Sequence, residues 1–483
     1  MPRALRRLLP VAALGLVLAL ALEACRFGYE SVAADVGASS GGDGGQATAG
    51  GGSAGLPDGA GSESGGTSAG MAGMEDSAGA PADDGGSGGT NDSGGTSGSG
   101  GRSGSGGTSG SGGTSGSGGR SGSGGTSGSG GRSGSGGSSG GSAGTGGGGS
   151  LVNLVVTTAA DESDAGATPS SPGKTGFSLR EAIAFANLTP GYQSITFNAA
   201  VATIGLVAPL PTVQETLDIT GAVVLDGTSN ASTSACLSVT TSNVRIESLE
   251  IHHCKGQPVL FASSSSTGNQ LIDSYLHDNQ KAAVVYGDGA VVSGCLITFS
   301  AAAGLEIYGR NARLLGNDVA ASLATNYSIK DGANGAYLLA NVSIGGGDGI
   351  GLGSVTGVTV WHSTIVDSVY AGLNVGAATL VDARNNIFMG ADTYGVLGPD
   401  SAFSKLDHNQ YFNNTSGHRS VGTLDATSLI GDPLFNDASN FDFALKVGSP
   451  AINKGFNLSV DRNQSAAGLY NGSAPDIGWL EAP

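Results

Sequence analysis

The chain has 483 residues, 89 of them glycine, and its 39 acidic against 21 basic side chains give a formal net charge of −18. Outside the first seven residues there is no basic cluster, so the composition argues against nucleic acid as a partner, because phosphates are met by clustered lysine and arginine. An acidic surface also repels uronic-acid polymers unless a local basic patch or a divalent ion intervenes.

The N-terminus is typical of a secreted protein. Residues 1–7 are basic and Leu8–Leu22 is an apolar run, which is short for a membrane span and suits a signal-peptide core. The run ends Leu22-Glu23-Ala24-Cys25, which resembles the lipobox of bacterial lipoproteins. That resemblance implies removal of residues 1–24, lipid on Cys25, and a location at the outer membrane or surface of a Gram-negative bacterium. Glu23 departs from the usual small apolar residue, so an ordinary secretory signal is the alternative.

Residues 25–150 are expected to be a flexible tether. From about Val36 to Ser150 the chain is nearly all Gly, Ser, Thr, Ala and Asp, with hexads of the type Thr-Ser-Gly-Ser-Gly-Gly. Such a composition cannot bury enough apolar surface to offset the entropy of ordering. A coil of roughly 115 residues of this kind has an r.m.s. span of about 55–65 Å, which would hold the remaining domain away from a bilayer.

Residues 151–483 are expected to form one domain that opens with a short helix. In the segment Phe177–Asn187, Ser178 is followed three residues later by Glu181, which makes a capping box, and three apolar residues can face a core: Leu179, Ile183 and Phe185. We expect this helix to close the open end of the first coil, whose backbone edge would otherwise be exposed. Short strands are expected at 194–197, 216–219 and 223–225.

Three columns of mostly apolar residues then recur at steps of about 22 residues, the last coil running through 407–411. The Ile251 column contains Ile251, Leu276, Ile297, Val319, Ile344, Ile365 and Ile387. The Ile246 column contains Ile246, Leu271, Val292, Leu314, Leu339, Val360 and, where the apolar rule lapses, Asp382. The Val259 column contains Val259, Val284, Leu305, Tyr327, Ile350, Leu373 and Val396. Three short strands per repeat bury nothing alone, but stacked they form one inner wall, which predicts an all-β parallel solenoid of about ten coils.

Two smaller patterns concern the residues at the bends and the spacing of the cysteines. The third position after the Ile251 column is small and polar, which indicates a structural ladder: Cys254, Asn279, Ser300, Ser322, Ser368 and Gly390. Cys254 and Cys295 lie about two repeats apart, or ~10 Å along the axis, which is too far for a disulfide. Cys236 and Cys254 are conceivable partners, although three buried free thiols is the favoured interpretation.

The helix segment resembles the CSLREAI motif of bacterial right-handed parallel β-helix proteins, with Phe177 where cysteine is common. The C-terminal stretches Asp432–Phe435, Phe443–Ile452 and Asp476–Gly478 are similar to the choice-of-anchor pattern of the same group. The resemblance implies the pectin-lyase-like superfamily, which contains polysaccharide lyases, hydrolases, epimerases and non-catalytic surface proteins. It therefore supplies a fold, a single-stranded right-handed parallel β-helix, and little about activity.

A first candidate site follows from that resemblance, since enzymes of the superfamily bind substrate along the first sheet. The columns predict Asn341, His362 and Arg384 at one position on three successive coils, with Trp361 beside them and the Lys330 loop projecting nearby. An aromatic face, a histidine base and cations for a uronate carboxylate would suit β-elimination. The alternative is that His362 fills a bend and Trp361 packs under a loop.

A rival cluster has three of the six histidines. His252 and His277 occupy one column position, so their rings should stack, and the neighbouring polar residues are His253, Asp278 and Lys281. Such a group indicates a metal site or an acid/base pair, and the alternative is a solvated turn. Calcium is a further cofactor to consider, although no aspartate set matches the calcium site of pectate lyases. The stretch Gly345–Gly351 is interpreted as a tight turn.

Two functions remain open at this point. The first is a surface-tethered, non-catalytic module that binds polysaccharide or cell-wall glycan, expected to be a monomer held to the membrane through lipid only. The second is a polysaccharide lyase or related enzyme acting on acidic glycans. The hydrolase signature of the superfamily (Asn-Thr-Asp, Asp-Asp, Gly-His-Gly, Arg-Ile-Lys) is absent from residues 151–483, which favours the non-catalytic module.

The lipobox generates a direct prediction. Cys25→Ser removes the thiol that would carry lipid, so the protein should move from the membrane pellet to the soluble fraction after ultracentrifugation. Unchanged membrane association of the variant would contradict lipidation at Cys25.

Overall fold

The computed structural model describes residues 152–462 and 469–482. The predicted signal peptide, Cys25 and the tether lie outside the described residues. In the described ranges no helix has the length and hydrophobicity that crossing a bilayer requires.

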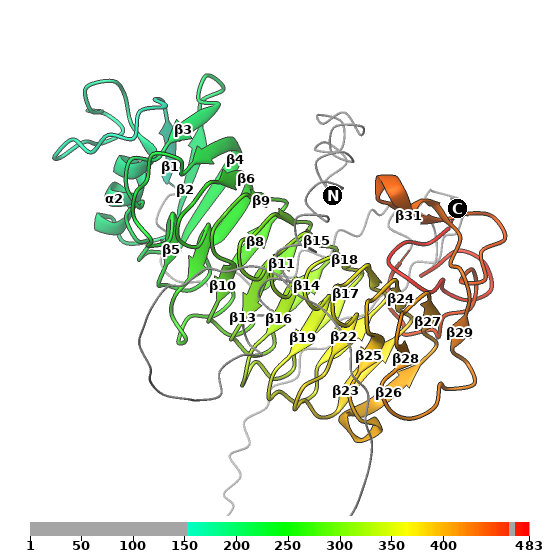
Figure 1. The fold of residues 1–483 in the computed structure, drawn as a ribbon. Coiled ribbons are helices and arrows are strands. Elements are labelled where there is room, and N and C mark those ends of the chain that lie inside the picture. The colour runs from blue at the N-terminus through cyan, green and yellow to red at the C-terminus, as the bar shows by residue number, and fades with distance from the viewer. Residues whose placement is uncertain (1–151, 463–468, 483) are drawn as a thin grey trace, which may run out of the picture. The chain divides into compact units, whose positions relative to one another are not determined.

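The domain begins with a strand and the expected helix (Figure 1). Strand β1 (Val152–Val156) pairs in parallel with β2 (Gln193–Phe197), and helix α2 (Leu179–Leu188) lies between them in sequence. The capping box is confirmed, since Glu181 N donates to Ser178 Oγ at 3.1 Å and Ser178 N donates to Glu181 Oε2 at 2.9 Å. The apolar side of α2 is buried, so the helix contributes to the first part of the core.

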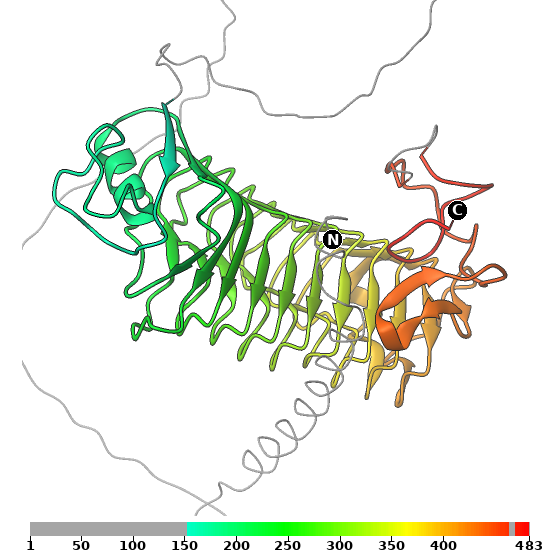
Figure 2. The ribbon, with the colours of Figure 1, turned by 90° about the horizontal axis from the view of Figure 1, so that it is seen from above.

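Each later coil contributes three short strands, all paired in parallel (Figure 2). The Ile246 column is formed by β8 (Gln270–Ile272), β11 (Val291–Ser293), β14 (Arg313–Leu315), β17 (Tyr337–Leu339), β20 (Thr359–Trp361), β23 (Val381–Arg384) and β26 (Phe403–Asp407). The Ile251 column is formed by β9 (Tyr275–His277), β12 (Leu296–Thr298), β15 (Asp318–Ala320), β18 (Val342–Ile344), β21 (Thr364–Val366), β24 (Ile387–Met389), β27 (Gln410–Phe412) and β29 (Leu429–Ile430). The Val259 column is a separate nine-stranded sheet of β5 (Leu237–Val239), β7 (Val259–Phe261), β10 (Ala283–Val285), β13 (Leu305–Ile307), β16 (Tyr327–Ile329), β19 (Ile350–Leu352), β22 (Leu373–Asn374), β25 (Tyr394–Leu397) and β28 (Gly417–Arg419).

Two long strands join the first two columns into one twenty-stranded sheet. Strands β4 (Leu217–Asp226) and β6 (Arg245–His252) run through both columns and pair with each other across a register shift, and β3 (Thr203–Gly205) pairs with the end of β4. Within the described residues, the remaining short elements are two 3₁₀ turns and an antiparallel hairpin: Asp400–Ala402, Ala438–Asn440, β30 (Phe435–Asp437) and β31 (Asp442–Leu445). The predicted architecture, a parallel β-solenoid of about ten turns, is confirmed.

The predicted columns are correct over most of their length and slip by one residue in a few coils. In the Ile251 column, the residues that lie in register with Ile365 are Ser343 and Phe388, and not Ile344 and Ile387. Ile344 and Ile387 face outward instead, where the C-terminal segment covers them with Phe435 and other apolar residues. A shift of one residue exchanges the two faces of a strand. Where the outer face is also buried, both faces carry apolar residues, and the sequence alone does not show which of them faces the core.

The other two columns show the same kind of slip. Leu338 and Ala383 occupy the Ile246 column in place of Leu339 and Asp382, so the residue in this column is apolar in these coils too. In the Val259 column, Ala283 replaces Val284.

The bends between coils are held by buried asparagines. Asn317 Oδ1 accepts from Cys295 N at 3.0 Å and Asn341 Oδ1 accepts from Asn317 N at 3.0 Å, and Asn386 and Asn409 repeat this arrangement two coils further on. Their Nδ2 groups donate to strand carbonyls of the preceding coil at 2.8–2.9 Å. Each amide therefore satisfies backbone groups that have no ladder partner at the bend.

The cysteines follow a different pattern from the expected one. Cys236 and Cys254 form a disulfide, with their Cα atoms 6.1 Å apart, and Cys295 is a buried free thiol. The interpretation of three free thiols was therefore wrong for two of them. The cause is that the first coils are irregular, so column arithmetic did not place Cys236. Burial raises the pKa of Cys295 to about 12, which keeps its thiol protonated.

The inner wall generates a stability prediction. Ile297 is 1 % exposed between Leu276 and Val319, so Ile297→Asp places an unpaired charge in the core and should cost more than about 4 kcal/mol or prevent folding. Arg313→Asp, at an exposed strand position, is the control and should cost less than about 1 kcal/mol. Urea denaturation followed by circular dichroism measures both, and equal midpoints for the two variants would contradict the assignment of inner and outer faces.

Candidate functional site

The predicted row of Asn341, His362 and Arg384 is not formed. Arg384 lies in register with Trp361, one position before His362, while Asn341 lies opposite Ser363 and belongs to the buried asparagine ladder. The expected alignment was wrong because it counted the repeats from Leu339 and Asp382, each one residue away from the true register.

His362 does not face a binding surface. It is 1 % exposed, and its Nε2 lies 2.9 Å from Asn385 Nδ2, which also donates to the Phe456 carbonyl. Burial and the nearby Arg462 charge hold the pKa of His362 well below its usual range, so the ring is neutral. A histidine buried in this way cannot approach a polymer, and the interpretation as a structural bend residue holds.

Trp361 and Arg384 are also engaged within the protein. Asp382 accepts from Trp361 Nε1 at 2.9 Å and from Arg384 Nε at 2.7 Å. The Arg384 guanidinium lies 5.3 Å from the ring centroids of both Trp361 and Phe456. This arrangement clasps the C-terminal segment to the solenoid, and the Arg384 cation is committed to contacts within the protein.

Lys330 lies at a different place from the one expected. It follows β16 of the nine-stranded sheet, whereas Trp361 ends β20 of the twenty-stranded sheet. There it lines an open hollow of about 380 Å³, whose polar lining residues include Tyr308, Ser328, Lys330, Asp331, Asp348 and Asn374. We call this the Asp348 hollow.

One outward position on the sheet that lines the hollow has no side chain. Glu306, Ser328, Gly351 and Asn374 follow each other in register along four coils. A Cβ atom at Gly351 would lie 3.1 Å from Thr325 Cγ2 and 3.6 Å from Asp348 Oδ2. A side chain here would press on Thr325, so glycine is the residue that fits between Ser328 and Asn374.

The carboxylates of the Asp348 hollow differ in their surroundings. Lys330 Nζ lies 2.9 Å from Glu306 Oε1, which compensates both charges. Asp348 accepts from Asn374 Nδ2 at 3.2 Å and from Ala371 N at 3.3 Å, and its burial raises its pKa to about 6. Near neutral pH the hollow is therefore net acidic.

A pair of aromatic rings continues the hollow along the sheet. Tyr308 stacks on Tyr286 of the preceding coil, with 4.5 Å between ring centroids. Aromatic faces next to hydrogen-bonding groups suit ligands that are polar at their edges and apolar on their faces. Sequence reasoning missed Tyr308, Asp348 and Asn374, although the 23-residue step from Gly351 to Asn374 was a usable signal.

The rival cluster is brought together as expected. His252 and His277 stack with 4.8 Å between ring centroids, which confirms the predicted pairing. His277 Nε2 lies 3.2 Å from Glu250 Oε1 and its Nδ1 lies 2.6 Å from Asp278 Oδ2. Burial alone would lower the pKa of His277, but these two carboxylates outweigh it and raise the pKa. Lys281 reaches instead toward the Thr233 carbonyl, 3.4 Å away.

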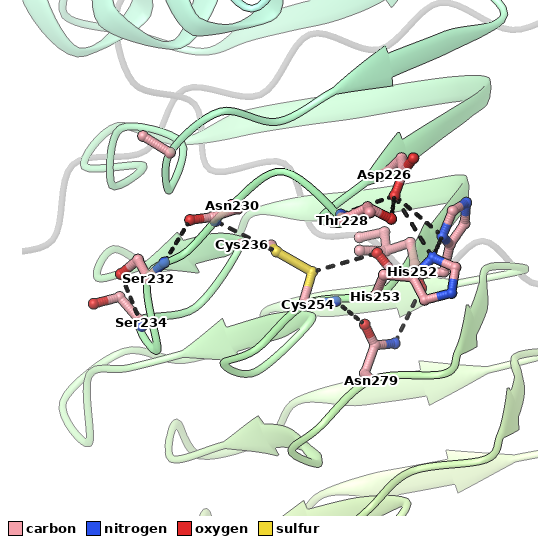
Figure 3. The surroundings of a disulfide bond; sticks show 12 residues. Asp226, Thr228, Asn230, Ser232, Ser234, Cys236, His252, His253, Cys254 and Asn279 are labelled. Atoms are coloured by element: carbon pink, nitrogen blue, oxygen red, sulfur yellow. Dashed lines mark hydrogen bonds and ion pairs between the residues drawn. A yellow bond between two sulfur atoms is a disulfide. The ribbon is translucent and has the colours of Figure 1, made fainter.

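The sequence did not indicate the partner on the other side of this cluster. Asp226 lies in register with His252 at the end of β4, and its Oδ1 is 3.5 Å from His252 Nδ1 and 3.6 Å from His253 Nδ1 (Figure 3). Burial and the neighbouring His277 lower the pKa of His252, so its ring is neutral near pH 7.

One further group of carboxylates bears on the expected calcium. Glu162, Asp164 and Glu181 offer oxygens within 4.8 Å of one another. Those oxygens already accept from the backbone: Glu181 from Asp164 and Ser178, Glu162 from Thr175, and Asp164 from Lys174. These bonds account for the group as the scaffold of the loop before α2.

Residues 283–464 match the family described as "Right handed beta helix region", so the solenoid is a right-handed parallel β-helix. No curated protein matches the chain.

Solved structures with a related outline are distant. Pectate lyase Pel9A is 16 % identical, over 70 % of this chain and 98 % of that chain, with a TM-score of 0.49. The Azotobacter vinelandii mannuronan C-5 epimerase AlgE4 A-module is 12 % identical, over 58 % of this chain and 91 % of that chain, with a TM-score of 0.37. The periplasmic alginate epimerase AlgG is 12 % identical, over 50 % of this chain and 75 % of that chain, with a TM-score of 0.31. A likeness at this level assigns no activity to the chain.

Asp348 generates a pH prediction. Because its folded pKa of about 6 lies above the ordinary 3.8, the folded state holds a proton that the unfolded chain releases at lower pH. Stability should therefore fall as the pH rises from about 4 to above 6, by up to about 3 kcal/mol. Asp348→Asn cannot titrate, so its stability relative to wild type should increase across this window.

Urea denaturation at several pH values between about 4 and 7.5 measures this difference. Asp331→Asn, at an exposed neighbour in the same hollow, is the charge-matched control. A constant stability difference between Asp348→Asn and wild type over the whole window would contradict the raised pKa.

Proposed function

We propose that this protein is a lipid-anchored β-helix of the cell surface that binds a neutral polysaccharide in the Asp348 hollow without cleaving it. The observation that carries the proposal is the open hollow itself, with hydrogen-bonding side chains beside the stacked Tyr286 and Tyr308 rings. The tether and Cys25 would supply the distance and attachment, as the sequence predicts.

The stacking of coils suits a polymer. Coils repeat at about 4.8 Å, so equivalent positions such as Glu306, Ser328 and Asn374 present their groups along a line. An extended sugar chain presents hydroxyls in the same repetitive way. Binding through several weak contacts along such a line fits a hollow that is open to solvent.

The local charge determines the class of glycan. Glu306 and Lys330 compensate each other, which leaves Asp331 and the ionised fraction of Asp348. A carboxylate-rich polymer would be repelled by this residual charge. A neutral polymer avoids that cost and can still accept and donate hydrogen bonds.

The catalytic alternative loses its main support. The β-elimination hypothesis needed His362 as an accessible base and Arg384 as a free cation, and the first is buried while the second is paired with Asp382. We therefore favour the non-catalytic module over the lyase.

Affinity electrophoresis and calorimetry with neutral and uronic-acid polysaccharides test the proposal on the full chain. Tyr308→Ala and Asn374→Ala should each weaken binding of a neutral glycan by about tenfold, as expected for the loss of one aromatic face or one hydrogen bond. Tyr192→Ala, at a tyrosine that is 44 % exposed before the regular coils, is the matched control and should bind like wild type.

Three outcomes would contradict the proposal: no neutral glycan binds, the hollow variants bind like wild type, or only uronates bind. Release of unsaturated uronates, detected by ultraviolet absorbance, would support the lyase instead.

A further inference from the structure

Three potential ligand atoms converge at the outer edge of the first regular coils. Asp226 Oδ1 lies 3.5 Å from His252 Nδ1 and 3.6 Å from His253 Nδ1, and the two Nδ1 atoms are 2.6 Å apart. Figure 3 shows both imidazoles turned toward the Asp226 carboxylate. Neither the glycan hollow nor the C-terminal clasp uses these residues.

The separations between these atoms fit a single small cation. A point equidistant from three atoms with these separations lies about 1.9 Å from each, in their plane. Histidine nitrogens and carboxylate oxygens bind zinc at about 2.0–2.2 Å. An ion slightly above the plane therefore meets all three atoms at bonding distance, once the imidazole that donates the Nδ1–Nδ1 hydrogen bond has moved its proton to Nε2.

The Asp226 side chain and the backbone next to the two histidines are held in place by their surroundings. Thr228 donates to Asp226 Oδ1 through its backbone N at 2.9 Å and its hydroxyl at 2.6 Å. Cys254 follows His253 directly, and its disulfide to Cys236 ties the bend to the preceding coil (Figure 3). Cys254 N also donates to the buried Asn279 at 2.9 Å. Ligands fixed in this way lose little freedom when an ion binds.

The site is also reachable from solvent. The side chain of His253 is 50 % exposed and that of Asp226 is 32 % exposed, while His252 is more covered at 15 %. An ion held on one side by three ligands would keep positions open for water or for a group of another molecule.

We propose that Asp226, His252 and His253 bind a divalent transition-metal ion. Two imidazoles and one carboxylate favour zinc, nickel, cobalt or copper over calcium, which takes six to eight oxygen ligands. The inference is independent of glycan binding, since the Asp348 hollow lies on the other sheet.

A neighbouring trio is the closest competitor within the described residues. Glu250, His252 and His277 also place ligand atoms within 4.8 Å of one another. However, His277 is already held at both ring nitrogens, by Glu250 at 3.2 Å and by Asp278 at 2.6 Å. Binding an ion there would break charge-assisted contacts to two carboxylates, whereas at the Asp226 trio it would break only the hydrogen bond between the two imidazoles, so the Asp226 trio is favoured.

Calorimetric titration of Zn²⁺, and separately Ni²⁺, into the EDTA-dialysed full chain tests the proposal. Wild type should bind about one ion per chain, and Asp226→Asn and His253→Asn should each weaken binding at least tenfold. Asparagine is chosen for position 253 because it tolerates the left-handed backbone there, φ 56°. Circular dichroism checks that both variants are folded, and bound Zn²⁺ should raise the melting temperature of wild type more than that of either variant.

His408→Asn is the matched control. His408 has φ 52° at an equivalent bend and lies 2.8 Å from Asp407 Oδ1, so the same change is made at a histidine–aspartate pair outside the trio. Its metal binding should equal that of wild type. The proposal is overturned if wild type binds neither ion, if the folded Asp226 and His253 variants bind like wild type, or if only His277→Asn removes binding.

Discussion

The whole domain depends on stacking parallel coils in register at their bends. Strands of three or four residues make too few ladder bonds to fix a coil, and the bends leave backbone groups without strand partners. Buried asparagine amides such as Asn317 and Asn341 supply those missing partners from coil to coil. Because an unmet buried amide costs about 1–3 kcal/mol, the ladder makes one register much more favourable than its neighbours.

This constraint limits function to the outer faces, which differ from one another. The C-terminal segment covers part of the twenty-stranded sheet, packing Phe435 and Ile477 on Ile344 and Ile387. The clasp of Arg384 between Trp361 and Phe456 reinforces that cover. The nine-stranded sheet retains an open hollow, and the first regular coils carry the histidines. The proposed glycan binding and the proposed metal binding therefore belong to separate surfaces of the solenoid.

Much of the fold could be predicted from the sequence, because local and periodic signals agree there. The capping box of Ser178 and Glu181 fixed the helix, and the 22-residue apolar period fixed the solenoid. The register of individual strands was harder to predict. Ser343 faces inward because Asn326 Nδ2 donates to its hydroxyl at 3.0 Å. This contact joins residues 17 apart in the sequence, and periodicity does not reveal it.

The candidate sites were harder to predict. The stacking of His252 on His277 followed from their shared column position. His362, in contrast, was predicted to act on a bound substrate, although the C-terminal segment buries it. Asp348 was interpreted only as part of a glycine-rich turn, and Asp226 lies in the irregular coils where column counting fails. A site built from neighbouring coils depends on register, so an error of one residue moves a side chain to the opposite face.

The central claim is that the open face of the nine-stranded sheet, and not the covered face beneath the C-terminal segment, meets the glycan. Hydrogen–deuterium exchange of the full chain with and without a neutral oligosaccharide measures this directly. The account predicts slower exchange in the turns that border the hollow, at 330–335 and 371–376, with no change at 455–462. Protection confined to 455–462 and the neighbouring Trp361 strand would contradict it.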